Sequence, residues 1–144
     1  MRKRLKKATL LIFAICLLSS FSSVSAAVMR SSDYMQSYSA YLTSKGGQVS
    51  VYATVTGRNN YYPKIGTSTI LIYESTNNGK TFSYYGIYES EDYPSMMGSG
   101  GRYSQVAISF PGTRGNQYKA TVYCYAEDNT SSEEIAYYTS AITA

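Results

Sequence analysis

The sequence predicts an all-β protein, an antiparallel sandwich of about seven strands, and two observations support this class. Segments rich in Tyr, Val, Ile and Thr follow one another from Asp33 onward, and these residue types favour strands. Clusters of Gly, Asn, Pro and Ser separate the segments at the spacing of turns between short strands. Residues 27–144 are long enough to bury one hydrophobic core, so we expect a single domain there.

The first 26 residues have the order of a cleavable secretory signal. A basic start precedes an apolar run from Ala8 to Leu18, and a Ser-rich stretch ends at Val24-Ser25-Ala26. The run is too short for the roughly 20 apolar residues of a membrane-spanning helix. We therefore expect cleavage after Ala26, secretion, and no stable membrane anchor. A lipid anchor on Cys16 is the alternative, although Ile15 precedes it where a lipoprotein requires a small residue.

Removal of this signal would change the charge of the protein. The full chain has 13 Lys and Arg and 9 Asp and Glu, and five of the basic residues lie in the signal. Eight basic and nine acidic residues then remain, which gives a net charge near −1. This balance is not that of a nucleic-acid-binding protein, so we expect no nucleic-acid partner. The only cysteine after the signal is Cys124, so no internal disulfide is expected.

The first three expected strands cover residues 34–43, 48–56 and 67–74. The first ends at the turn Lys45-Gly46-Gly47. The second alternates strictly from Val49 to Val55, with apolar residues on one face and Ser, Tyr and Thr on the other, which indicates a half-buried strand. The third contains Ile70-Leu71-Ile72-Tyr73, which is apolar on both faces and typical of a central strand.

Four further strands are expected over residues 81–89, 105–110, 117–126 and 135–142. Asn78-Gly79 before the first of these indicates a hairpin, because both residues tolerate positive φ. The octet from Ser75 to Phe82 resembles the Asp-box hairpin of sialidases, S-x-D-x-G-x-T-W, with Asn77 and Phe82 replacing the acid and the Trp. A single copy implies a hairpin only. Residues 90–104 are expected to form a loop.

The stretch from Pro111 to Ala126 resembles the turn and sixth strand of fibronectin type III and immunoglobulin domains. In those domains a turn precedes a Tyr whose hydroxyl bonds back across the corner. The resemblance implies an immunoglobulin-like, fibronectin type III-like β-sandwich in which Tyr118 is the corner tyrosine and Cys124 lies in the core. The chain also resembles small secreted proteins of Gram-positive bacteria that end in strands like Tyr137-Tyr138-Thr139-Ser140-Ala141. That likeness implies export and carries no activity.

Several chemistries are excluded or disfavoured by composition. The chain has no histidine, which excludes the usual Ser-His-Asp and Cys-His catalysis and histidine metal sites. Cys124 shares its strand face with apolar residues, so a buried, inert thiol is expected. We therefore expect no enzyme activity and no cofactor.

Two alternatives depend on the acidic residues. A small hydrolase requires two facing carboxyl groups, and the candidates are Glu74, Glu89, Glu91 and Asp92. Calcium binding at the loop pairs Glu91-Asp92 or Glu127-Asp128 is the other alternative. Neither pair has the regular acidic spacing of a dedicated calcium loop, so no metal site is expected.

Tyrosine is the most distinctive component, with 17 residues against four Phe and no Trp. In the sixth expected strand Tyr123 and Tyr125 alternate with Val122 and Cys124, so they should face outward. Tyr52 should do the same in the second strand. The resembled topology places the third, fourth, sixth and seventh strands in one sheet. The candidate outward face therefore consists of Tyr73, Tyr85, Tyr123, Tyr125 and Tyr138.

Two interpretations of this face remain open. Cross-strand aromatic pairs stabilise a sheet without any ligand, and Tyr is also a preferred contact residue of binding interfaces. We expect a secreted, non-enzymatic binding or interaction module whose partner is an extracellular protein or a glycan. A carbohydrate-binding module that uses exposed Tyr is the alternative within this class. The sequence does not define the oligomeric state.

Overall fold

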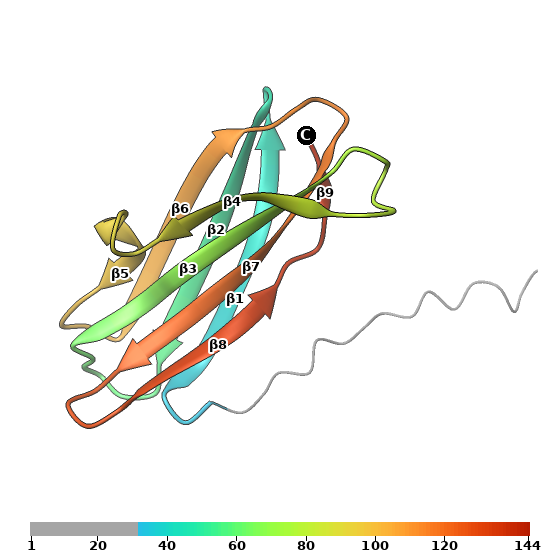
Figure 1. The fold of residues 1–144 in the computed structure, drawn as a ribbon. Coiled ribbons are helices and arrows are strands. Elements are labelled where there is room, and N and C mark those ends of the chain that lie inside the picture. The colour runs from blue at the N-terminus through green and yellow to red at the C-terminus, as the bar shows by residue number, and fades with distance from the viewer. Residues whose placement is uncertain (1–31) are drawn as a thin grey trace, which may run out of the picture. The chain divides into compact units, whose positions relative to one another are not determined.

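The computed structural model describes residues 32–144, and these form two antiparallel sheets packed face to face (Figure 1). The expected signal segment and Cys16 lie outside the described residues. The architecture is an immunoglobulin-like β-sandwich, as the sequence predicted. Across the described part of the chain, no helix has the length and apolar character needed to cross a membrane.

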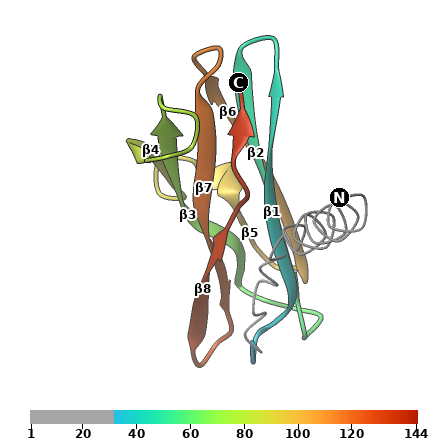
Figure 2. The same cartoon turned by 90° about the vertical axis from the view of Figure 1, so that its right-hand side faces the viewer.

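The first sheet has three strands in the order β1-β2-β6. Its members are β1 (Met35–Lys45), β2 (Gln48–Gly57) and β6 (Tyr103–Pro111). The second sheet has the order β4-β3-β7-β8. Its long members are β4 (Ser83–Glu89), β3 (Lys64–Ser75), β7 (Gln117–Glu127) and β8 (Ser132–Tyr138). Figure 2 shows the two sheets edge-on as two layers.

Three short elements complete the fold. The expected loop over residues 90–104 contains the 3₁₀ helix η1 (Pro94–Met96) and β5 (Met97–Gly98), which pairs with β3. The last expected strand is divided: β8 ends at Tyr138, and β9 (Ile142–Thr143) pairs separately with the start of β7. The seven long strands otherwise follow the predicted order, and four of them share a sheet as the resemblance implied.

The core lies between the facing sheets and follows the alternation of their strands. On β2, the residues Val49, Val51, Ala53 and Val55 are at most 1% exposed. Ile70, Ile72 and Val122 meet them from the other sheet and are fully buried. Each fully buried aliphatic side chain stabilises the fold by about 1.5–3 kcal/mol relative to an exposed one.

The hairpin between β3 and β4 has the expected turn. Asn78 and Gly79 have φ values of 59° and 81°, a left-handed conformation that Asn and Gly adopt at little cost. Asn77 closes the turn, because its Oδ1 accepts hydrogen bonds from Ser75 Oγ at 2.9 Å and from the Thr81 amide at 3.0 Å. The resemblance to the Asp-box therefore corresponds to a structural hairpin.

Tyr118 and Cys124 both face the core from β7. Tyr118 is fully buried, and its hydroxyl donates to Glu74 Oε1 at 2.5 Å and accepts from the Thr113 amide at 2.8 Å. Burial and the hydrogen bond to Glu74 raise the pKa of Tyr118. Cys124 is also fully buried, and desolvation raises the pKa of its thiol to about 12. A thiol with this pKa is protonated at neutral pH and unreactive.

Candidate functional site

The outward side of the four-stranded sheet carries the candidate residues. On β7, the even-numbered residues from Tyr118 to Ala126 are buried in the core. Tyr123 and Tyr125 alternate with them and therefore point to the outward side. Both residues are half-buried there.

Strand register places further residues on this side in adjacent rows. Residues directly opposite each other in antiparallel strands point to the same face. Tyr73 of β3 lies opposite Tyr84 of β4 and Lys119 of β7. In the next row Leu71 lies between Ile87 and Thr121, and Thr121 lies opposite Tyr138. A third row contains Tyr123, with Ala136 on one side and Thr69, followed by Glu89 of β4, on the other.

These rows form what we call the tyrosine face. Its members are Leu71, Tyr73, Tyr84, Ile87, Tyr123 and Tyr138. The most exposed of them are Tyr138 at 74%, Tyr84 at 61% and Ile87 at 43%. Three of the five predicted outward tyrosines, Tyr73, Tyr123 and Tyr138, thus lie together on one surface.

Tyr85 does not belong to the tyrosine face, so that prediction was wrong. Its ring lies 5.3 Å from the Phe110 ring and 5.5 Å from the Tyr118 ring, and its hydroxyl donates to the Pro111 carbonyl at 2.7 Å. The cause is a bulge between β3 and β4. Ile72 lies opposite Gly86, whereas Tyr73 lies opposite Tyr84, so Tyr85 is an extra residue that turns toward β6.

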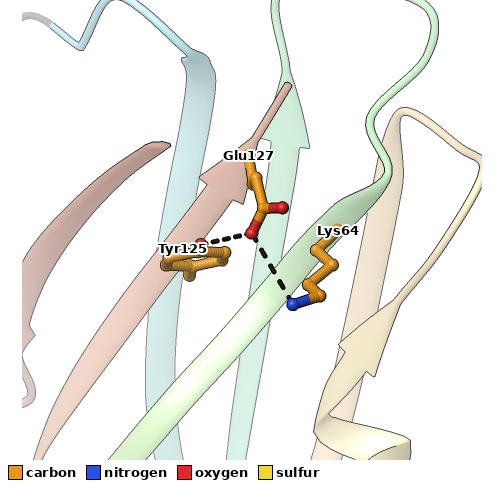
Figure 3. Close-up of polar contacts among 3 residues, drawn as sticks. All are labelled: Lys64, Tyr125 and Glu127. Carbon is orange, nitrogen blue, oxygen red and sulfur yellow. Dashed lines mark hydrogen bonds and ion pairs between the residues drawn. The ribbon is translucent and has the colours of Figure 1, made fainter. Parts of the chain in front are cut away.

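Tyr125 lies on the outward side but at a polar end of it (Figure 3). Its hydroxyl donates to Glu127 Oε2 at 2.6 Å, and Lys64 Nζ lies 3.7 Å from the same oxygen. The hydrogen bond to Glu127, followed by burial, raises the pKa of Tyr125. A pocket of about 420 Å³ opens beside the ring and is lined by Lys64, Ser68, Ser90, Glu91, Pro94, Met97 and Tyr125.

The acidic candidates are distributed over separate parts of the domain. Glu74 belongs to the Tyr118 corner, where it also accepts from Asn116 Nδ2 at 2.9 Å. Glu91 lines the pocket beside Tyr125, at the other end of β3. Glu89 and Asp92 are both exposed. The structure therefore does not join Glu74 and Glu91 in one cleft.

The acidic pair Glu127-Asp128 has local structural partners. Asp128 Oδ1 accepts hydrogen bonds from the Thr130 amide, the Thr130 hydroxyl and the Ser131 amide at 2.7–2.9 Å. These bonds, led by those from Thr130, lower the pKa of Asp128. Glu127 pairs with Tyr125 and Lys64. Within residues 32–144, no group of three or more His, Cys, Asp or Glu side chains is arranged to hold a metal ion.

The outward side of the three-stranded sheet has a different composition. It is made of alternate residues of β1, β2 and β6, most of them Ser, Thr or Gln. Tyr52 faces outward here as predicted, and its ring stacks on that of Tyr41 at 5.1 Å and 14°. Ser50 and Ser109 share a hydrogen bond of 2.7 Å between their hydroxyls. We call this surface the Ser/Thr face.

Tyr84, Leu71 and Ile87 are members of the tyrosine face that sequence reasoning did not identify. Leu71 lies in a run that is apolar on both sides, so alternation left its direction undecided. Ile87 has the opposite parity to Tyr88, which packs partly against the core. Tyr84 has the same parity as Tyr88, and it shares the face of Ile87 only because of the bulge. Two signals in the sequence bear on these residues: the apolar run of β3 contains Leu71, and alternation from Tyr88 places Ile87 outward. The direction of Tyr84 depends on the bulge between Tyr84 and Gly86, which the sequence does not indicate.

Comparison with known proteins shows weak structural likeness only. No family model matches the sequence, and no curated protein is similar to it. A selenomethionine-labelled β-glucosidase from Kluyveromyces marxianus aligns with a TM-score of 0.36 and 10% identity over 72% of this chain. The same enzyme in complex with glucose aligns with a TM-score of 0.35, and this chain spans 15% of its length. A protein from Archaeoglobus fulgidus aligns over 76% of this chain and 97% of its own, with 11% identity and a TM-score of 0.35.

Proposed function

We propose that this protein is an exported, non-enzymatic binding module that contacts an extracellular protein through the tyrosine face. The observation that supports the proposal is the exposure of Tyr84, Ile87 and Tyr138 in adjoining rows of one sheet surface. Contiguous apolar surface of this kind is uncommon on soluble monomers and marks interaction sites.

The chemistry of the face fits the centre of a protein interface. Such centres are rich in aromatic residues and poor in Lys, Glu and Asp. Leu71 and Ile87 occupy the middle row, which carries no charge. The charged residues lie in the rows beside it: Lys119, whose Nζ lies over the Phe82 ring at 4.4 Å from its centroid, and Glu89 on the edge strand β4. Tyrosine also loses little conformational entropy on binding, because it has two side-chain torsions.

A glycan is the second candidate, and the pocket beside Tyr125 favours it. Sugar recognition combines an aromatic surface with polar groups that bond hydroxyls, and Lys64, Ser68 and Glu91 line this pocket with Tyr125. The middle of the tyrosine face has aliphatic Leu71 and Ile87 instead, which add contact area without hydrogen bonds. The protein partner is therefore the better match for the larger surface.

The test is capture of a partner from the native environment with two double variants. Tyr84→Ser with Tyr138→Ser removes the two most exposed rings of the tyrosine face. Tyr61→Ser with Tyr103→Ser removes rings of 60% and 55% exposure elsewhere, and serves as the matched control. We expect the first variant to lose capture at least about tenfold, since buried aromatic contacts dominate binding energy, and the control to retain it.

Thermal melts of both variants separate lost binding from unfolding. Equal capture by the folded Tyr84 and Tyr138 variant would refute the proposed protein-binding face. Binding to a glycan array that is lost only with Tyr125→Ala would support the second candidate instead.

A further inference from the structure

Of the seven long strands, four lie at sheet edges: β1 and β6 in one sheet, and β4 and β8 in the other. An edge strand presents unpaired backbone N–H and C=O groups that can pair with another chain. Natural proteins obstruct such edges with inward-pointing charges, Pro, bulges, short strands or covering segments. The four edges of this domain differ in whether they carry such a feature.

The edge of β8 is obstructed by charge. Glu133 lies opposite the buried Ala126 and thus on the inward side of the sheet. Its Oε2 accepts hydrogen bonds from Ser32 Oγ at 2.6 Å and from the Tyr34 amide at 3.1 Å. Glu134 follows it on the outward side. An incoming strand would have to accommodate two adjacent carboxylates.

The edges of β4 and β6 have other obstructions. β4 has seven residues and contains the bulge at Tyr85. β6 ends at Pro111, which has no N–H, and the Pro111 carbonyl already accepts a hydrogen bond from Tyr85. At its other end β6 contacts η1.

From Ser37 to Lys45 the edge of β1 has none of these features, and its one irregularity is the register shift between Met35 and Ser37 at the start of the strand. β1 has 11 residues and pairs with β2 in continuous register from Ser37 to Lys45. It contains no Pro or Gly, and its one charged residue is Lys45 at the end. Among the residues that the structure describes, no strand pairs with its other edge. Neutral segments of high β-propensity such as this one are prone to strand pairing.

We propose that β1 pairs antiparallel with β1 of a second copy of this chain, with the two-fold axis at Tyr41. Pairing that keeps the buried side buried requires residues of the same strand face to lie opposite each other. Residues of one strand face are an even number of positions apart, so the two-fold axis must pass through a residue and not between two residues. An axis at Tyr41 places Tyr41 opposite its counterpart on the Ser/Thr face.

The side chains of β1 are complementary to themselves in this register. Ser39 lies opposite Thr43 on the outside, and Ala40 lies opposite Leu42 on the inside. The other inward pair, Tyr38 and Ser44, combines an aromatic with a small polar side chain. Lys45 lies opposite Ser37, so no like charges face each other. The stacked rings of Tyr41 and Tyr52 would continue across the axis into a row of four. An axis at Ala40 would instead place Tyr41 opposite Ser39 and break this row.

A charge at the axis tests the proposal. Tyr41→Lys places two ammonium groups directly opposite each other, whereas Tyr103→Lys introduces the same charge on the same sheet face at the far edge. The two tyrosines are matched in exposure, at 54% and 55%. In sedimentation velocity over a concentration series, we expect the unchanged protein to dimerise, Tyr41→Lys to weaken the dimer at least about tenfold, and Tyr103→Lys to leave it unchanged. A protein that is monomeric at all concentrations, or an equal effect of both variants, would overturn the proposal.

Cysteine cross-linking tests the register. Directly opposite Cβ atoms lie about 4.5–5.5 Å apart, close enough for a disulfide after small adjustments. Tyr41→Cys should form a covalent dimer under mild oxidation. Ser39→Cys and Thr43→Cys should each remain uncross-linked alone and form a covalent dimer when mixed. The unchanged protein, in which Cys124 is buried, gives the background. A covalent dimer of Ser39→Cys alone would contradict the axis at Tyr41.

Discussion

The two ends of the sandwich are each closed by a tyrosine without exposed surface, but the two side chains are held differently. At one end, the Tyr118 hydroxyl donates to the Glu74 carboxylate at 2.5 Å. At the other, the Tyr62 hydroxyl donates to the main-chain carbonyl of Tyr34 at 2.6 Å and accepts from the Asn59 amide at 3.2 Å. One end thus depends on a charged side chain and the other on backbone geometry.

This difference shows how the same residue type closes a sandwich from a strand or from a loop. Tyr118 is the second residue of β7, so strand alternation alone turns it inward. Tyr62 lies between β2 and β3, and its position depends on the absence of a side chain at Gly57. A Cβ atom at Gly57 would lie 2.2 Å from Cε2 of the Tyr62 ring. At this end of the sandwich, the position of the tyrosine is therefore determined by close packing against Gly57 and not by strand alternation.

The largest expected effect follows removal of the Tyr62 ring, which closes the end of the sandwich formed by the loop between β2 and β3. Tyr62→Ala should lower the free energy of unfolding by about 3–5 kcal/mol, because a fully buried aromatic side chain leaves a cavity. The neighbouring Tyr61 is 60% exposed, so Tyr61→Ala should cost less than about 0.5 kcal/mol. Urea unfolding of both variants measures the two values. Similar losses from the two variants would show that Tyr62 does not close this end.

A smaller effect should distinguish the two hydroxyl groups. Tyr118→Phe should cost about 1–3 kcal/mol, because it removes a hydrogen bond from a buried hydroxyl to a charged group and leaves the Thr113 amide without this acceptor. Tyr62→Phe should cost about 1 kcal/mol, since both partners of its hydroxyl are main-chain groups. The Tyr34 carbonyl keeps the hydrogen bond from the Arg58 amide at 2.9 Å, and the Asn59 amide loses only a bond of 3.2 Å. Thermal melts of the two variants give the order. An unchanged melting temperature for Tyr118→Phe would remove its role as a corner residue.

The smallest expected effect is a pH dependence specific to the Tyr118 end. The pKa of Tyr118 is raised in the folded protein, chiefly by burial and then by the bond to Glu74. The unfolded chain therefore loses this proton first, and the free energy of unfolding falls as the pH rises above about 10. In the Tyr118→Phe variant, the free energy of unfolding should fall less steeply with pH. Urea unfolding midpoints measured from pH 8 to pH 11 give both curves. Parallel curves for the two proteins would contradict this contribution.

The sequence was informative where one strand face is apolar and the other is polar. On β2, the alternation from Val49 to Val55 predicted the buried and outward residues, including Tyr52. On β7, the same reasoning placed Tyr123 and Tyr125 outward, opposite in parity to Cys124. Period two is a direct consequence of strand geometry, so it can be read without tertiary information.

Other features depend on contacts that no local pattern contains. The bulge beside Tyr73 reverses the direction of Tyr85, and nothing in Tyr84-Tyr85-Gly86 indicates which residue is the extra one. The burial of Tyr62 follows from packing against Gly57 across a loop, where no strand period applies. The tyrosine face therefore excludes Tyr85 and includes Leu71, Tyr84 and Ile87, which the alternation of the sequence does not identify.

The hydrogen bonds of Ser32 have a mechanical consequence for the domain. Ser32 Oγ donates to Glu133 of β8, and the Ser32 carbonyl accepts from Arg58 Nε at 2.7 Å. A pulling force applied through the chain before Ser32 would load these two contacts before it reached the ladder between β1 and β2. β1 pairs with one neighbouring strand, β2. Under such a force, the two Ser32 hydrogen bonds would therefore break before β1 separates from β2.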